Sequence, residues 1–242
     1  MAKRFRVVKW VILIVMLALL VGGGAMAWMA RTPPSYWQEP AEIPAAQLEQ
    51  MEQVGVALEN RLPGEFTQPR TEGEIWTCTL TQNEMNAWIT TRMTKWLRSQ
   101  GEWLEERGLP TRLPQEFKHP MVDITPKRLA LAAEAEVEGK KQIVSCEFSS
   151  FKGPNDIARV RLNAIKGGRL PLPRGILDML IEKLGSEEKA REQAITAASL
   201  KLQETDLIIP LSGGWKVNIL DAKVDNGAVT LTCQSFSAKS EQ

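Results

Sequence analysis

The sequence predicts an α+β protein in which a curved antiparallel sheet wraps around or packs on a long amphipathic helix, with one N-terminal transmembrane helix. Three observations predict this class: an uncharged apolar run near the start, a wide apolar stripe at helical spacing after residue 81, and three period-two runs after residue 128. They divide the chain into a cytoplasmic tip and signal-anchor at 1–30, a Pro-rich stalk at 31–44, an extracytoplasmic α+β domain at 45–236 and a polar tail at 237–242.

The first predicted element is a transmembrane helix over residues 10–30, which carry no charged side chain. At ~1.5 Å rise per residue, about 20 helical residues cross a ~30 Å hydrocarbon core. Trp10 and Trp28 fall where an interfacial aromatic belt would lie, and basic residues at 3, 4, 6 and 9 place the N-terminus in the cytoplasm. A signal peptide cleaved after Ala27 is the alternative, and either interpretation exports the domain.

Residues 32–44 contain four prolines and predict a stiff, extended stalk that lifts the domain off the bilayer. Residues 45–61 have helical periodicity, and Pro63-Gly64 is expected to end that helix. Residues 74–80 predict a short strand.

The clearest helix begins after Thr81, because residues 81–84 (TQNE) have the pattern of a capping box. Large apolar side chains then recur on one face at three- and four-residue spacing, and the helix is expected to continue, with a kink at Gly101, to Gly108. This apolar stripe consists of Met85, Trp88, Ile89, Met93, Trp96 and Leu97.

Three runs of alternating apolar and polar residues follow, at 129–137, 144–148 and 158–164, and turn residues join them. They predict an antiparallel meander with one solvated face. On the first run, Leu129 and Leu131 belong to the inner side, and the glutamates at 134, 136 and 138 to the solvated side. The arginines at 159 and 161 are expected to pair with these glutamates across the strands.

The C-terminal part predicts a short apolar helix that begins near Pro173 and ends at Gly185, and then a more polar helix to about residue 202. Strands are expected at 207–211, 216–224 and 228–233. Asn226-Gly227 suits the type I′ turn of a hairpin between the last two.

No residue pattern specifies a reaction, a cofactor or a metal. The single histidine, His119, has no GxSxG nucleophile motif to serve, and the three cysteines, at 78, 146 and 233, are too far apart for a metal knuckle. They predict buried thiols, with one disulfide as the alternative. The net charge of +1 excludes a global field that would recruit nucleic acid.

Two stretches carry a resemblance to a known family: residues 80–89, LTQNEMNAWI, and residues 168–177, GRLPLPRGIL. With the single N-terminal anchor and the meander, they resemble the YpmS-like family of bacterial membrane-anchored envelope proteins, and more loosely the TULIP-type and YceB-like proteins. The resemblance covers roughly residues 45–235. It implies a strongly curved antiparallel sheet that wraps a helix, with lipid held in the groove between them in the better-understood relatives.

We therefore expect a non-enzymatic, single-pass protein of the cell membrane whose extracytoplasmic domain binds a lipid or another hydrophobic ligand. The alternatives are a ligand-free scaffold that holds an envelope protein partner, and an extracytoplasmic hydrolase; the apolar stripe itself equally suits an ordinary core. The groove is expected to use Met85, Trp88, Ile89, Met93, Trp96, Leu97, Leu172, Ile176, Leu177 and Leu180.

Overall fold

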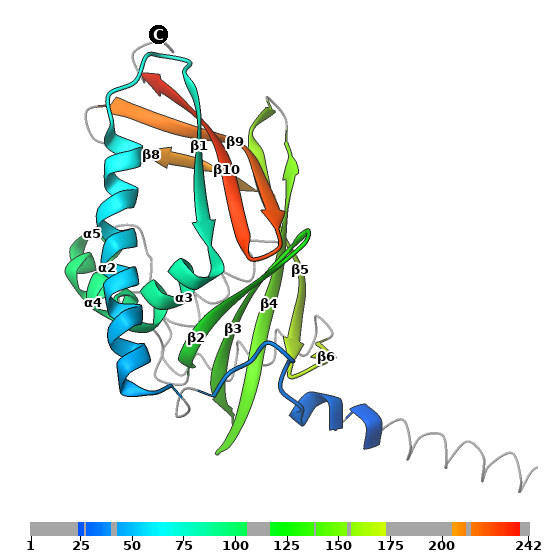
Figure 1. The fold of residues 1–242 in the computed structure, drawn as a ribbon. Coiled ribbons are helices and arrows are strands. Elements are labelled where there is room, and N and C mark those ends of the chain that lie inside the picture. Colours follow the sequence, from blue (N-terminus) through cyan, green and yellow to red (C-terminus); the bar gives the residue numbers. More distant parts are fainter. Residues whose placement is uncertain are drawn as a thin grey trace, which may run out of the picture.

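The computed structural model describes residues 24–26, 28–39, 43–105, 117–137, 139–153, 156–172, 205–211 and 214–237. These residues form a mixed α and β structure with two antiparallel sheets and few helices (Figure 1). The predicted combination of helices with antiparallel strands is confirmed. The strands divide into two sheets, whereas the sequence predicted one.

The four-stranded sheet joins the two ends of the domain, in the order β1-β10-β9-β8. Its strands are β1 (Ile75–Thr81), β8 (Ile208–Pro210), β9 (Trp215–Asp225) and β10 (Ala228–Ser237). The predicted β9–β10 hairpin is confirmed, and Gly227 in its turn has a φ of 76°. Because β1 pairs with β10 along its whole length, it lies outside the meander that follows it in the sequence.

The six-stranded sheet is the predicted meander, extended at both sides, in the order β2-β3-β4-β5-β6 with β7 also paired to β5. Its strands are β2 (Phe117–Thr125), β3 (Arg128–Val137), β4 (Lys140–Lys152), β5 (Ala158–Gly167), β6 (Leu170–Pro171) and β7 (Thr205–Asp206). The three predicted strands 129–137, 144–148 and 158–164 lie within β3, β4 and β5.

Helix α2 (Ala45–Thr67) continues past the proline that was expected to end it, since Pro63 lies inside the helix. Contacts beyond the proline hold the last turn in place. Phe66 packs edge-on against Trp76, with ring centroids 5.1 Å apart, and the Gln68 N–H donates to the Gly64 carbonyl. Tertiary packing thus offsets the hydrogen bond that Pro63 removes.

The predicted long helix after Thr81 is three short ones: α3 (Gln82–Thr91), α4 (Met93–Ser99) and α5 (Gly101–Glu105). The capping box at its start is confirmed, since the Thr81 hydroxyl accepts from the Glu84 N–H and the Glu84 carboxylate accepts from the Thr81 N–H. The first break comes earlier than the expected kink, at Arg92, whose guanidinium donates to Glu59 of α2 at 2.6 Å.

Two side-chain amides of α3 take the place of a further strand beside β2, at the edge of the six-stranded sheet. Asn86 donates to the Val122 carbonyl at 2.8 Å and accepts from the Val122 N–H at 2.6 Å. Gln82 accepts from the Ile124 N–H at 2.7 Å. These bonds satisfy backbone groups that an edge strand would leave unpaired, and they fix α3 against the sheet.

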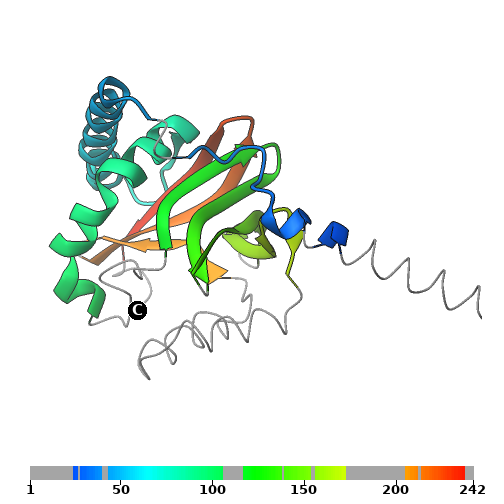
Figure 2. The same ribbon diagram turned by 90° about the horizontal axis from the view of Figure 1, so that it is seen from below.

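Two clusters of buried side chains join these layers. One centres on Ala158, Val217, Ile219 and Cys233, where β5 meets the four-stranded sheet. The other centres on Val122, Ile124 and Val229, under Met85 and Ile89 of α3. Figure 2 shows the helices α2 to α5 on one side of the strands and the described helical residues before position 32 (blue) on the other.

Residues 28–39, most of them expected to form a free stalk, instead pack along the six-stranded sheet from β6 towards the start of α2 (Figure 1). Pro34 is buried, and Arg169 at the β5–β6 turn bonds to the carbonyls of Met29 and Pro33. No helix within the described ranges is long and apolar enough to cross a membrane. Most of the expected transmembrane run, residues 10–23 and Ala27, lies outside those ranges.

Candidate functional site

The register of the six-stranded sheet collects its apolar side chains on one face. Directly opposed residues of antiparallel strands share a face, so residues opposed on successive strands form a row across the sheet. One row is Ile124, Leu129, Phe148 and Leu162, and the next is Val122, Leu131, Cys146 and Ile165.

Among the residues that the structure describes, this apolar face is covered at its edges and open at its centre. Val122 and Ile124 are buried beneath α3, and the far ends of β4 and β5 contact β9, where Ser150 donates to the Ala222 carbonyl. Between them Leu131 is 43% exposed. On the opposite face of the same strand, Ala130 and Ala132 are 0% and 1% exposed. The face predicted to be dry is therefore more open at this point than the face predicted to be solvated.

The other face is polar and covered, which corrects the expectation of a solvated surface. Arg128 bonds to the carboxylates of Asp123 at 2.7 Å and Glu147 at 3.1 Å, and Lys166 bonds to Glu147 at 2.7 Å. Tyr36 of the N-terminal segment lies beside Arg128, whose guanidinium carbon is 5.8 Å from the ring centroid. Burial raises the pKa of Tyr36. Two cations here balance two carboxylates, so the cluster is typical of a structural ion network.

The expected pairing of the β3 glutamates with Arg159 and Arg161 is wrong, because β4 lies between β3 and β5. The glutamates pair with lysines of the strands on either side. Glu134 lies 3.1 Å from Lys141, and Glu136 lies 3.3 Å from Lys118. Ala164, expected beside Leu162, lies on the polar face, because a bulge beside Phe148 brings Ala164 opposite Glu147.

The predicted groove residues that the structure describes flank the open apolar face from two sides. Met85 and Ile89 pack on Val122 and Ile124 at the β2 edge. Leu172 lies at the other edge, where its N–H donates to the Ile165 carbonyl at 2.8 Å. The other four predicted residues that the structure describes, Trp88, Met93, Trp96 and Leu97, are half-buried on α3 and α4.

Trp88 and Trp96 contact each other edge-to-face across the break at Arg92, with ring centroids 5.9 Å apart. Ile176, Leu177 and Leu180 lie outside the described residues. The residues at the centre of the open face, Leu131, Cys146 and Ile165, were not among the predicted site residues. Their period-two spacing marked Leu131 and Cys146 as apolar-face residues, but spacing carries no signal of which part of a face is covered.

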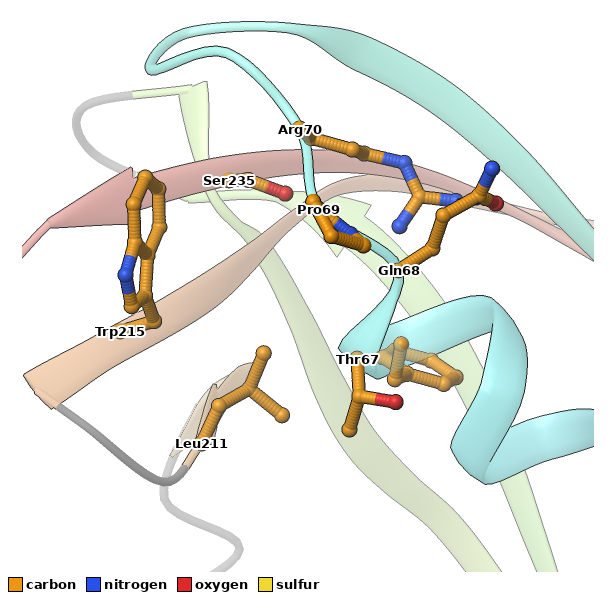
Figure 3. A pocket seen from close by; sticks show the side chains of 8 residues that line it. Thr67, Gln68, Pro69, Arg70, Leu211, Trp215 and Ser235 are labelled. Carbon is orange, nitrogen blue, oxygen red and sulfur yellow. Dashed lines mark hydrogen bonds between the residues drawn. The ribbon is translucent and has the colours of Figure 1, made fainter.

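A separate cavity of about 250 Å³ lies where the end of α2 meets the ends of β9 and β10 (Figure 3). Its walls are Phe66, Thr67, Gln68, Pro69, Arg70, Leu211, Trp215 and Ser235. Figure 3 shows Trp215 and Leu211 on one side of Pro69, and the Arg70 guanidinium on the other beside Gln68. That guanidinium stacks on Trp76 at 3.8 Å from the ring centroid, so it is engaged within the fold.

The cysteines divide between the two sheets: Cys78 and Cys233 lie on the adjacent strands β1 and β10, both near Glu65, whereas Cys146 lies on β4. Cys78, Cys146 and Cys233 are free thiols, and burial raises the pKa of Cys78 to about 12 and that of Cys233 to about 11. His119 is exposed on β2. Among the described residues, no three His, Cys, Asp or Glu side chains are placed to hold a metal ion. The open apolar face is therefore the feature that best qualifies as a functional site.

Comparison with protein-family models, with curated proteins and with solved structures found no match to this chain. The resemblance to the YpmS-like family stays a prediction from the two sequence stretches.

Proposed function

We propose that the protein is a membrane-anchored, extracytoplasmic binding protein that holds a lipid or another hydrophobic ligand on the apolar face of the six-stranded sheet. The observation that carries this proposal is the exposure of Leu131, 43%, at the centre of a face whose edges are buried. The ligand would lie over Leu131, Cys146 and Ile165, between α3 and Leu172.

The chemistry of this face favours an acyl chain or a similar apolar group. The row through Leu131, Cys146 and Ile165 is extended by Leu172, and it presents no charge. Strands lie about 4.8 Å apart, so three strand spacings make a path of roughly 14 Å. Covering the exposed part of Leu131 alone is worth on the order of 1 kcal/mol, and each covered neighbour adds to this.

Anchorage would keep this face close to its source of ligand. The uncharged run over residues 10–30 predicts a membrane span, and the described residues begin within this run, at Gly24. A lipid that leaves the bilayer would then meet the domain without free diffusion of the protein.

Photocrosslinking in the membrane tests the proposal. A benzoylphenylalanine is introduced at position 131 of the full chain, and for comparison at position 208. Ile208 is a matched control because it is an apolar strand residue, 42% exposed, on the four-stranded sheet.

After irradiation of membranes, mass spectrometry of the purified chain identifies what the probe has captured. We expect a lipid adduct at position 131 and none at position 208. A protein adduct at 131 would favour the scaffold function instead, and a crosslink from 131 to another part of the same chain would show that the face belongs to the core. Either result refutes lipid binding at this face.

A further inference from the structure

Two large apolar side chains on the N-terminal helical residues are among the most exposed of those that the structure describes. Trp28 is 64% exposed and Met26 is 54% exposed. Two arginines lie next to them: Arg31 follows in the chain, and Arg169 reaches the same segment from the β5–β6 turn, both with exposed side chains. Figure 1 shows these helical residues (blue) extending beyond β6 and away from both sheets. We call Met26, Trp28, Arg31 and Arg169 the junction patch.

The β5–β6 turn is in close contact with the end of this N-terminal segment. The Arg169 N–H donates to the Met29 carbonyl at 2.9 Å, and its side-chain Nε donates to the Pro33 carbonyl at 3.1 Å. Arg169 thus satisfies the Met29 carbonyl, one of those that a helix leaves unpaired at its C-terminal end, where a cation is also favoured, and the Pro33 carbonyl just beyond the helix.

Gly168 makes this close approach possible. Its φ is 58°, and a Cβ atom on it would lie 2.4 Å from the Ala30 carbonyl oxygen and 2.7 Å from that of Thr32. Any other residue at 168 would force the segment away from the turn. The Gly168-Arg169 pair, part of the second stretch that carries the family resemblance, therefore has a structural role in docking residues 29–33.

We propose that the junction patch is a bilayer-contact surface that binds anionic phospholipid headgroups, and that the β5–β6 turn fixes it rigidly to the six-stranded sheet. This inference rests on the proposed anchorage through residues 10–30. Exposed tryptophan suits the membrane interface, and guanidinium groups bind phosphate oxygens in bidentate geometry. The domain would then sit at one fixed orientation on the bilayer, which a flexible stalk would not provide.

Limited trypsin digestion of the full chain in nanodiscs tests both parts. Cleavage after Arg31 separates the domain from the anchor, and cleavage after the exposed Lys152 at the end of β4 normalises for protease activity. The variant Gly168→Ala is compared with Gly139→Ala, a glycine with a φ of 72° and no atom within 4 Å of an added Cβ. Both substitutions place alanine at a positive φ, and they differ in the clash that the added Cβ meets.

We expect Gly168→Ala to increase the cleavage rate after Arg31 at least tenfold relative to Lys152, and Gly139→Ala to leave it unchanged. Cleavage after Lys166, a strand position of β5, identifies any variant that has unfolded. Equal rates in both variants overturn the rigid junction.

The headgroup contact is tested with nanodiscs of phosphatidylcholine and of phosphatidylcholine mixed with phosphatidylglycerol. In the wild-type chain, phosphatidylglycerol should slow cleavage after Arg31 severalfold, and Arg169→Gln should reduce that protection. The same rate in both lipid mixtures overturns headgroup binding. A chain that fails to enter nanodiscs refutes the anchorage itself, which is a distinguishable result.

Discussion

The side chain of Asn86 should be one of the larger single contributions to stability in this domain, because it bonds to both backbone groups of one buried edge residue. The variant Asn86→Ala removes its bonds to the Val122 N–H, at 2.6 Å, and to the Val122 carbonyl, at 2.8 Å. Val122 is 3% exposed, so water cannot easily replace the lost partner. An unsatisfied buried polar group costs about 1–3 kcal/mol, and two such groups predict a loss of about 2–6 kcal/mol.

The assay is urea denaturation of the full chain in mild detergent, followed by circular dichroism. Asn83→Ala is the matched control, since Asn83 is exposed on the same turn of α3 and alanine favours a helix. We expect the free energy of unfolding to fall by about 3 kcal/mol for Asn86→Ala and to change by less than about 0.5 kcal/mol for Asn83→Ala. If the two variants unfold at the same urea concentration, the amide does not hold α3 to the sheet, and the reasoning is refuted.

Two further predictions concern the packing of α2 and the buried thiols. An added Cβ at Gly55 would lie 2.8 Å from the Thr91 hydroxyl and 3.2 Å from the Ala87 carbonyl, so Gly55→Ala should lower the free energy of unfolding by about 1–3 kcal/mol. Gly64→Ala is the control on the same helix, because its added Cβ meets open space, and it should raise the free energy of unfolding by about 0.5–1 kcal/mol in the same denaturation assay. A stabilising Gly55→Ala would contradict the close contact between α2 and α3. Burial raises the pKa of Cys78 from 9.0 to about 12 and that of Cys233 to about 11. The folded state therefore favours the neutral thiols more than the unfolded state does. The stability that this difference contributes is complete below about pH 9 and is lost as the pH rises towards 11 and 12. The free energy of unfolding measured from pH 8 to 11 should therefore fall above pH 9, and Cys78→Ala should lessen that fall; a wild-type curve that stays flat would contradict the burial of these thiols.

Local patterns predicted most of the strands and the start of the clearest helix. The capping box at Thr81 and the β9–β10 turn at Gly227 need only neighbouring residues, and both are present as predicted. The ends of helices depend on distant contacts. Pro63 lies inside α2 because Phe66 meets Trp76, and the break at Arg92 accompanies its ion pair with Glu59.

Bulges are a second feature that the sequence does not predict, because a period-two pattern cannot show where an extra residue enters a strand. At the bulge opposite Phe148, the apolar face of β5 passes from Leu162 to Ile165, so Ala164 turns to the other side. The alternation of apolar and polar residues continues through residue 164 in the sequence, so it gives no sign that Ile165 belongs to the open face.

The candidate site shows why the exposure of a face is harder to predict than its composition. The apolar and polar sides of β3 were assigned correctly by residue type, since Leu129 and Leu131 do share one face. What covers each face depends on segments far away in the chain. The N-terminal segment lies over the polar face at Tyr36, because Gly168 admits its carbonyl groups and Arg169 bonds to them. The polar face is thereby buried with its charges paired. The exposed Leu131 at the centre of the apolar face is therefore the feature on which we base the proposed ligand site.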